Sequence, residues 1–258
     1  MADDREGVVA ANRRYWDRST PEKMAHGSYP LAAFRAGEST LFAHEREEVG
    51  SVSGRSLLHL QCNNGLETLS WARAGADAVG LDVSGESLRV ARDLAAEAGL
   101  DAAFVQCDVY DAADALDRRF DVVYTSRGVL GWLPDLDEWA DAVAGSLADD
   151  GRFYLFEGHP LVHAVDGDLD AVRSYFETGP HERTESDFGA DERHFLTHHR
   201  LGEVLTALAS AGLSVEFLRE HPFDYWHRWD RMVRDDAGRW RLPGDPIPLS
   251  FSLLATPA

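Results

Sequence analysis

Residues 56–82 read SLLHLQCNNGLETLSWARAGADAVGLD, and this stretch decides the fold. Its opening apolar run is long enough for a buried strand and ends at Cys62-Asn63-Asn64-Gly65, where the residue types tolerate left-handed backbone. Apolar residues then return at helical spacing from Leu66 to Ala74, and a second apolar strand closes on Asp82. The stretch therefore predicts a β-loop-α-β unit with a carboxylate at the second strand tip.

This unit has a chemical use. A loop at a helix N-terminus presents free backbone N–H groups. An acid at the tip of the next strand can accept two hydrogen bonds from ribose hydroxyls. The stretch therefore predicts a site for a cofactor that carries a nucleoside, between the loop and Asp82.

The chain after Asp82 continues to alternate between helix and strand. Ser84 is suited to cap a helix that Gly99 ends. The third strand ends on Asp108, and the fourth is followed by Thr125-Ser126-Arg127-Gly128. The segments expected in order are helix 84–98, strand 103–107, helix 112–116, strand 120–124, helix 136–147, a turn at 149–151 and strand 152–157.

The remainder of the chain predicts an insertion and a closing hairpin. Residues 158–197 lack clear periodicity and are rich in His, Asp, Gly and aromatic residues, which is typical of an insertion over an active-site edge. The following pattern predicts helix 199–211, strand 213–220, an aromatic-rich excursion over 221–229 and a last strand within 247–255.

The N-terminal region, Ala10 to Val49, reads as helical in pieces, with breaks at Thr20-Pro21 and at 26–30. Two interpretations remain open. The region is a cap that packs on the sheet, or its aromatic residues Tyr15, Trp16 and Tyr29 close over a pocket.

The order of these strand-tip features resembles the class I S-adenosylmethionine-dependent methyltransferases, whose first motif is a strand ending in an acid-x-Gly-x-Gly-x-Gly loop. Here His59 stands at the usual acid, Gln61 and Asn63 stand at the first two glycines, and Gly65 keeps the third. Asn63 preserves the bend because asparagine adopts left-handed backbone. The resemblance covers residues 56–157 and extends more weakly to the C-terminus.

The resemblance implies an α/β, Rossmann-like fold in one domain over 1–258, with a seven-stranded, mostly parallel sheet and an antiparallel last strand. It implies four parts, which are a helical N-terminal cap over 1–50, a cofactor-binding core over 51–157, an inserted lid over 158–198, and a C-terminal helix and β-hairpin over 199–258.

The resemblance also implies S-adenosyl-L-methionine as cofactor and S-adenosyl-L-homocysteine as product. Its motifs fall on the expected cofactor-binding residues Gln61, Cys62, Asn63, Asn64, Gly65, Asp82, Val83, Asp108, Val109 and Ser126. The expected substrate-pocket residues are Tyr15, Trp16, Tyr29, Arg127, Tyr225 and Trp226.

Histidines supply the candidate catalytic residues. A general base is useful if the acceptor is a hydroxyl or a protonated amine, and we expect His194 or His159, with His194 favoured because it lies in an aromatic run. His159 and His163 are four residues apart, as are His194 and His198, a spacing that can hold zinc on a helix. The sequence lacks a third-ligand pattern, so we expect no metal.

Composition restricts the partners. The 258 residues carry a formal net charge of −20, which argues against nucleic-acid and anionic-membrane partners and favours a small-molecule substrate. Lys23 is the single lysine among 25 basic residues. A salt-rich cytoplasm and a GC-rich genome both explain this bias, and the sequence does not separate them or indicate the oligomeric state.

Cysteine usage and hydropathy predict the compartment. The two cysteines, Cys62 and Cys107, are too few for a disulfide framework. The sequence contains neither a signal peptide pattern nor an apolar run of membrane-spanning length. We therefore expect a soluble, cytoplasmic protein.

Two other function classes remain open. An NAD-dependent dehydrogenase uses the same β-α-β unit, but it requires G-x-G-x-x-G, and the loop of this chain lacks those glycines. A non-catalytic adenosylmethionine-binding or interaction protein is also compatible, because no catalytic residue is mandatory for methyl transfer.

Overall fold

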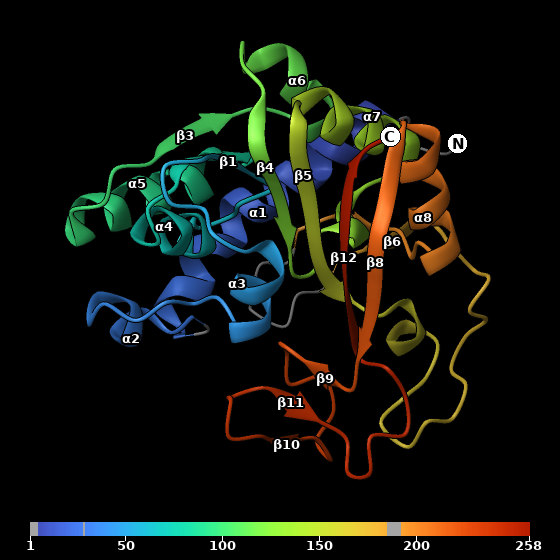
Figure 1. The fold of residues 1–258 in the computed structure, drawn as a ribbon. Helices are drawn as coiled ribbons and strands as arrows, with labels where there is room; N and C mark the ends of the chain where they lie inside the picture. The colour runs from blue at the N-terminus through green and yellow to red at the C-terminus, as the bar shows by residue number, and fades with distance from the viewer. Residues whose placement is uncertain (1–4, 28, 185–191) are drawn as a thin grey trace.

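The computed structural model describes residues 5–27, 29–184 and 192–258. Its main sheet has seven strands in the order β3-β2-β1-β4-β5-β12-β8 (Figure 1). Neighbours from β3 to β5 are parallel, whereas β12 is antiparallel to both β5 and β8. The predicted seven-stranded, mostly parallel sheet with an antiparallel last strand is confirmed. The strands are β1 (Ser56–Leu60), β2 (Asp77–Asp82), β3 (Ala103–Gln106), β4 (Phe120–Ser126), β5 (Leu147–Gly158), β8 (Leu213–His221) and β12 (Ser250–Pro257).

Helices cover both faces of this sheet. One core layer joins α6 (Ala112–Ala115), α7 (Leu136–Ser146) and α8 (Leu201–Ser210) to apolar side chains of the strands. The other face is covered by α3 (Ala43–Val49) and α4 (Leu66–Arg73), and α5 (Gly85–Ala98) packs beside α4. The central strands are buried on both faces, which explains their near-continuous apolar runs.

Two tryptophans anchor the helices on opposite faces. Trp139 of α7 is fully buried and meets Phe153 edge-to-face, with ring centroids 5.6 Å apart. Trp71 of α4 is 1% exposed and meets Tyr124 in the same way at 5.4 Å. Truncating either side chain to alanine should cost about 3–5 kcal/mol of stability.

The N-terminal region forms α1 (Arg5–Ala25), α2 (Leu31–Arg35) and α3. The predicted interruption after Ala25 is confirmed, but the predicted break at Thr20-Pro21 is wrong, because α1 runs through Pro21. Thr20 is fully buried, and its hydroxyl lies 2.8 Å from the Ser87 hydroxyl of α5. Packing against α5 therefore keeps the helix continuous past the proline.

Local capping chemistry determines the ends of α5. The Ser84 hydroxyl accepts a hydrogen bond from Ser87 N at 3.0 Å, and Gly99 ends the helix in left-handed backbone at φ 62°. Both caps are as predicted. The predicted turn at 149–151 is not a separate turn, since β5 begins at Leu147 and the register against β4 shifts between Phe120 and Val122.

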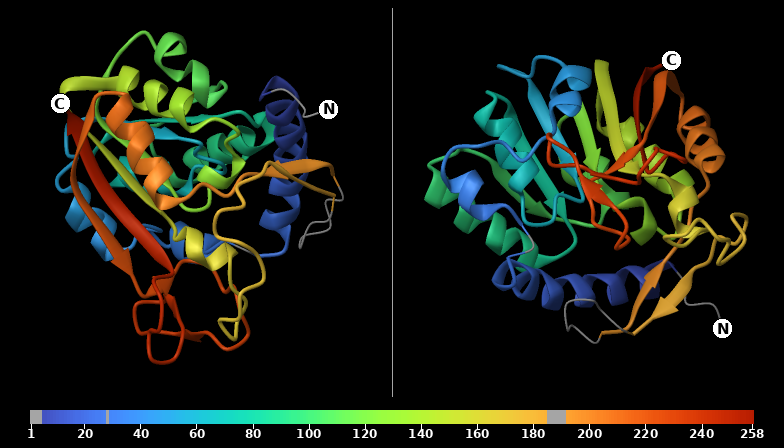
Figure 2. Two further views of the ribbon diagram at one scale, coloured as in Figure 1. Left: turned by 90° about the vertical axis from the view of Figure 1, so that its right-hand side faces the viewer. Right: turned by 90° about the horizontal axis from the view of Figure 1, so that it is seen from below.

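The segments after β5 and β8 contain short elements. Residues 158–184 and 192–198 form η3 (Pro160–His163) and a two-stranded sheet of β6 (His181–Arg183) and β7 (His194–Leu196), and the part of the predicted lid at 185–191 lies outside the described residues. The excursion after β8 forms a small sheet of β9 (Phe223–Asp224), β10 (Val233–Arg234) and β11 (Trp240–Arg241). Both segments lie at the end of the main sheet where β5 and β8 finish, and α1 passes beside β7 (Figures 1 and 2).

Within the described ranges no helix is both long enough and apolar enough to cross a membrane. Cys62 is buried, Cys107 is half-buried, and both are free thiols.

Candidate cofactor and acceptor site

A cavity of about 1120 Å³ opens where β1, β2, β4 and β5 end. The loop after β1, the tip of β2 and the residues after β3 form one part of its wall. The loop after β4, α1 and the segments after β5 and β8 form the rest. The cavity thus occupies the edge where open α/β sheets bind ligands.

Left-handed backbone shapes the loop after β1. Gln61, Asn63 and Gly65 have φ values of 55°, 48° and 74°. A Cβ added to Gly65 would lie 2.7 Å from Ala91 Cβ and 2.8 Å from the Phe104 ring, so only glycine lets α4 begin this close to α5. Gln61, Cys62, Asn63 and Asn64 line the cavity, whereas Gly65 lies behind its wall.

Asp82, the last residue of β2, is held by two backbone donors. Its Oδ2 accepts from Asn63 N at 2.8 Å, and its Oδ1 accepts from Ser84 N at 2.8 Å. Burial raises the pKa of the Asp82 carboxyl to about 6, against the lowering effect of these donors. Asp82 and the following Val83 both line the cavity.

His59 is a fully buried bridge under the loop. Its Nδ1 lies 2.8 Å from the Thr68 hydroxyl and its Nε2 lies 3.2 Å from the Ser126 hydroxyl. Burial, together with the charge of Arg127, lowers the pKa of His59 to about 3. A neutral imidazole therefore joins β1, α4 and β4 at the position where the resembling family has an acid.

Two amide oxygens of the loop lack partners. Within the described part of the chain, Gln61 Oε1 and Asn63 Oδ1 are buried and accept no hydrogen bond. Both residues line the cavity. Buried acceptors without partners are costly, so these two oxygens fit the N–H or O–H donors of a bound ligand.

Asp108 follows β3 and caps η1 (Val109–Asp111) by accepting from Tyr110 N at 3.4 Å. Burial raises the pKa of its carboxyl. The cavity wall includes Asp108, the buried Val109 and, at the end of β4, Ser126.

Glu157 organises the loop after β4, and the sequence did not reveal this. Its carboxylate accepts from Gly128 N at 2.6 Å, Val129 N at 2.7 Å and Leu130 N at 3.1 Å. It also accepts from Gly158 N at 2.6 Å and from the Tyr225 hydroxyl at 3.0 Å. A single acid at the end of β5 thus fixes the cavity wall, and the only sequence signal is its position beside Gly158.

Arg127 lines the cavity, but its guanidinium already has partners. It forms ion pairs with Glu45 and, at 3.3 Å, with Glu67, and Nη2 donates to the Thr40 carbonyl at 3.0 Å. Glu45 is fully buried, and the two carboxylates outweigh burial and raise the Arg127 pKa. The side chain is therefore part of a buried charge network as well as of the wall.

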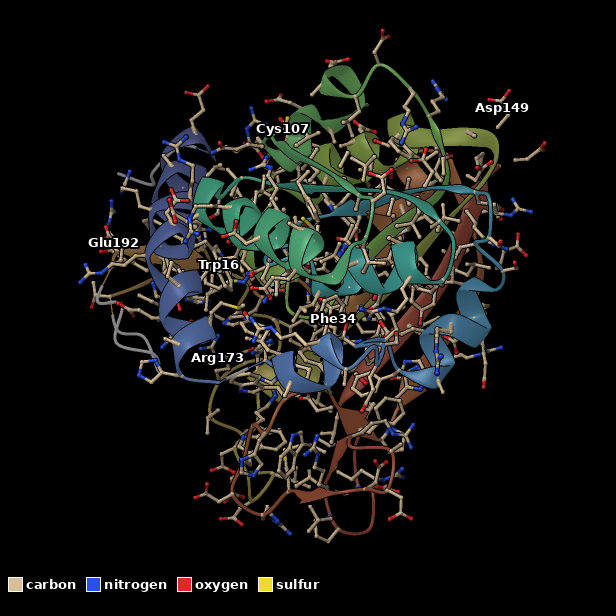
Figure 3. All side chains as sticks on the ribbon, turned by 90° about the vertical axis from the view of Figure 1, so that its left-hand side faces the viewer. Trp16, Phe34, Cys107, Asp149, Arg173 and Glu192 are labelled. Atoms are coloured by element: carbon tan, nitrogen blue, oxygen red, sulfur yellow. The ribbon has the colours of Figure 1, made fainter. Side chains whose placement is uncertain are left out.

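Aromatic side chains of the N-terminal region face the cavity. Tyr15, Trp16 and Tyr29 line it, as do Tyr225 and Trp226 from the segment after β8. Tyr15 stacks on Trp132, with centroids 5.2 Å apart, and Figure 3 shows Trp16 between α1 and the body of the molecule. The structure thus brings all six expected substrate-pocket residues, Arg127 included, to one cavity.

The two expected catalytic histidines do not line this cavity. His194 is 4% exposed, with its ring 4.2 Å from Tyr15 and its Nδ1 2.9 Å from the Glu192 carbonyl. His159 caps η3 by accepting from Leu161 N at 3.2 Å, and its Nε2 lies 3.1 Å from Glu220. Packing holds the side chain of His194 and capping holds that of His159, so the structure does not bring either expected base to the cavity wall.

Other polar residues reach the cavity, and among them the sequence had indicated only Glu157, His198 and His199 as side chains near this edge of the sheet. These other polar residues are Glu67, Glu157, His163, His198, His199, His227, Arg228 and Arg234. Glu67 lies on α4 and Glu157 on β5, whereas the others come from segments after β5 and β8 that lack periodicity, so only the folded chain brings them together. Among the residues described, no three His, Cys, Asp or Glu side chains are arranged to hold a metal ion.

Comparison with known proteins finds a domain match over the central part of the chain. A methyltransferase domain family matches residues 58–153. A ubiquinone biosynthesis O-methyltransferase from Salmonella paratyphi A is 32% identical over 146 residues, which are 57% of this chain. The chain spans about half the length of this curated relative, with 56% of it covered.

Solved structures share the fold. An S-adenosylmethionine dependent methyltransferase from Listeria monocytogenes has a TM-score of 0.60 at 19% identity, covering 83% of this chain and 97% of that one. The glycopeptide N-methyltransferase MtfA, complexed with S-adenosylmethionine, has a TM-score of 0.59 at 20% identity, covering 83% and 92%. With the strand order and the domain match, these findings show that the chain has the Rossmann-like fold of class I S-adenosylmethionine-dependent methyltransferases and that its residues 58–153 are similar to a methyltransferase domain.

Proposed function

We propose that this protein transfers the methyl group of S-adenosyl-L-methionine to a small-molecule acceptor and releases S-adenosyl-L-homocysteine. The observation that carries this proposal is a set of hydrogen-bond acceptors at the sheet edge. Among the described residues, Gln61 Oε1 and Asn63 Oδ1 are buried without a partner, and the buried Asp82 carboxylate lies beside them. They fit a ligand that brings several N–H and O–H donors, as a nucleoside linked to an amino acid does.

Different residues of the cavity wall would bind different parts of the cofactor. Asp82 would accept hydrogen bonds from the ribose hydroxyls, and Asp108 with Val109 would hold the adenine. Gln61 and Asn63 would accept from the ammonium group of the methionine portion, with Cys62, Asn64, Val83 and Ser126 completing the wall. When bound, the cofactor supplies an electrophilic sulfonium methyl group.

The remaining wall would orient the acceptor and exclude water. Tyr15, Trp16 and Tyr29 would cover the pocket from the N-terminal side, and the described residues of the segment after β5, 158–184 and 192–198, would act as its lid. Orientation of two reactants in a closed pocket accounts for much of the rate in such transfers, so no dedicated base is required. The two free cysteines and the acidic charge support a cytoplasmic enzyme with a small-molecule partner.

Mass spectrometry of the purified protein, followed by calorimetry with S-adenosyl-L-methionine, tests the cofactor. Asp82→Ala should weaken the binding by about 1.5–3 kcal/mol, the range for hydrogen bonds to a charged group, and Asp108→Ala should weaken it less. Unchanged affinity in Asp82→Ala would remove Asp82 from the ribose site. A co-purified nicotinamide dinucleotide would instead favour the dehydrogenase.

An acceptor screen that reads release of S-adenosyl-L-homocysteine tests the catalysis. Turnover with any small-molecule acceptor supports an enzyme. Tight cofactor binding without turnover across the screen would favour a non-catalytic binding protein.

A further inference from the structure

One part of the cavity wall carries no carboxylate. Among the described residues, the acids that line the cavity are Glu67, Asp82, Asp108 and Glu157, and all of them precede Gly158. From Gly158 onward the wall holds cationic and imidazole side chains instead. In a chain with 45 acidic and 25 basic residues, this distribution is a strong local bias. The charged and imidazole residues of this part are His163, His198, His199, His227, Arg228 and Arg234.

Arg228 presents its guanidinium to the cavity from a fixed position. Its Nε donates to Asp224 Oδ2 at 3.0 Å, and Asp224 is fully buried. Its Nη2 lies 3.6 Å from where a Cβ on Gly158 would stand, so the head group lies at the end of β5. Within the described part of the chain it makes no other side-chain hydrogen bond, which leaves its Nη donors for a ligand.

Two cavity-lining imidazoles pack together in this part of the wall, and the charge of Arg228 acts on one of them, His163. The His163 and His198 rings are 4.5 Å apart, and the His181 ring lies 5.1 Å behind His198. Buried polar atoms here lack partners within the described ranges: Arg173 Nη1, His181 Nε2 and His198 Nε2. We call His163, His198 and Arg228 the basic wall. Arg173, labelled in Figure 3, does not line the cavity, but its charge acts on both His163 and His198.

The electrostatic environment of the basic wall is positive. Burial lowers the pKa of His163 to about 3, and the charges of Arg228, Arg173 and Arg183 add to this effect. Burial lowers the pKa of His198 to about 4, again with Arg173 and Arg183 contributing. Asp224 pairs with Arg228 on its Nε side, and Glu177 lies 3.9 Å from His181. Arginine charges therefore dominate at the two cavity-lining rings.

We propose that the acceptor of this methyltransferase carries an anionic oxygen group, a carboxylate or a phosphoryl group, that Arg228 binds on the basic wall. This inference rests on the proposed function, since it names the acceptor class of that site. A guanidinium offers paired N–H donors that match the two oxygens of a carboxylate or phosphoryl group. Binding the anion at the end of β5 would place the remainder of the acceptor toward the cofactor part of the same cavity.

The experiment uses calorimetry on the full chain saturated with S-adenosyl-L-homocysteine. Inorganic phosphate and benzoate are the anionic probes, and benzamide is the neutral match of benzoate. We expect at least one anion to bind over the millimolar range and benzamide not to bind. Arg228→Gln should weaken that anion at least about tenfold, as loss of a charge-assisted pair predicts. Which anion binds decides between a carboxylate and a phosphoryl group.

Matched variants distinguish a specific loss of anion binding at the basic wall from the effect of removing any positive charge and from the effect of misfolding. Arg231→Gln removes the same charge from a nearby exposed arginine that pairs with Asp168, and it should change the anion affinity less than about twofold. Asp224→Asn with Arg228→Gln avoids an uncompensated buried acid, and this double variant should fold and still fail to bind the anion. Asp224→Asn alone should retain anion binding.

Three results would overturn the proposal: no anion binding by the wild-type chain, equal anion binding by wild type and the double variant, or binding of benzamide as tight as that of benzoate. The S-adenosyl-L-homocysteine titration is read separately. If that titration fails while an anion still binds to the unloaded chain through Arg228, the proposed function is wrong and the anion site remains.

Discussion

The backbone N–H of Asn63 donates to Asp82 Oδ2 at 2.8 Å, so the loop after β1 and the tip of β2 share one carboxylate. The same carboxylate is buried, and burial raises its pKa to about 6. A charged Asp82 is thus well positioned to bind a ligand, but its burial lowers the stability of the ligand-free protein. Removing the Asp82 charge should therefore raise the free energy of unfolding and weaken ligand binding.

Asp82→Asn tests this opposition. Because the folded pKa is raised, the stability that Asp82 contributes is fully present below its unfolded pKa and is lost as pH rises through about 6. At pH 8 the ligand-free variant no longer buries the Asp82 charge, so its free energy of unfolding should be about 1–2 kcal/mol higher than that of wild type. The gain is smaller than the raised pKa alone implies, because asparagine has one hydrogen-bond acceptor fewer than aspartate. Urea denaturation at pH 8 and again below pH 5 should show this gain shrinking.

Asp149→Asn is the control, because Asp149 is exposed on β5 (Figure 3). Its effect should be small at both pH values. If the Asp82→Asn gain is the same at both pH values, the buried charge is not its cause.

Glu157→Gln should destabilise the loop after β4. The substituted amide puts a donor among backbone N–H groups of Gly128, Val129 and Leu130, so at least one buried N–H loses its acceptor. We expect a loss of about 3 kcal/mol in the free energy of unfolding and faster hydrogen exchange at these amides.

Tyr225→Phe is the matched comparison for Glu157→Gln. It removes one hydrogen bond of 3.0 Å to the same carboxylate and leaves the backbone donors in place, so it should cost about 1 kcal/mol. Equal losses for the two variants would show that Glu157 does not organise the loop.

The pair of Arg127 and Glu45 should show strong energetic coupling. Glu45 is fully buried, so Arg127→Met leaves its charge uncompensated and should cost about 3–5 kcal/mol. Adding Glu45→Gln should recover part of this loss, because the double variant buries no charge at this pair. Chemical denaturation of the four proteins of this cycle gives the coupling, and additive losses would contradict it.

Local chemistry explains what the sequence predicted. The β-loop-α-β unit, the Ser84 cap and the Gly99 end depend on residues near one another in the chain, and all three are confirmed. The cofactor residues implied by the family resemblance fall on one cavity wall, apart from Gly65 behind it.

Distant contacts explain what it did not predict. The continuity of α1 through Pro21 depends on Thr20 meeting Ser87 of α5. The five donors of Glu157 come from the loop after β4, from Gly158 and from Tyr225. The His194 ring packs against Tyr15 of α1 and does not line the cavity. No local pattern encodes such pairings.

Salt should separate the two explanations of the charge of −20. If the acidity is a halophilic adaptation, KCl should raise the melting temperature by screening self-repulsion, with most of the effect reached near 1 M, where the Debye length is about 3 Å. Thermal melts from low to molar KCl measure this. A flat or falling melting temperature leaves a GC-rich genome as the better explanation of the arginine bias.

His194→Ala should act on stability rather than on turnover. The ring lies 4.2 Å from Tyr15 and 5.6 Å from Trp132, so its loss should lower the free energy of unfolding by about 1–3 kcal/mol. With an identified acceptor, kcat should stay within about threefold of wild type, far from the 10²–10⁴-fold contribution of a general base. His163→Ala, on the basic wall, should instead raise KM for the acceptor. A loss in kcat beyond about tenfold in His194→Ala, with normal stability and cofactor affinity, would restore His194 as the base.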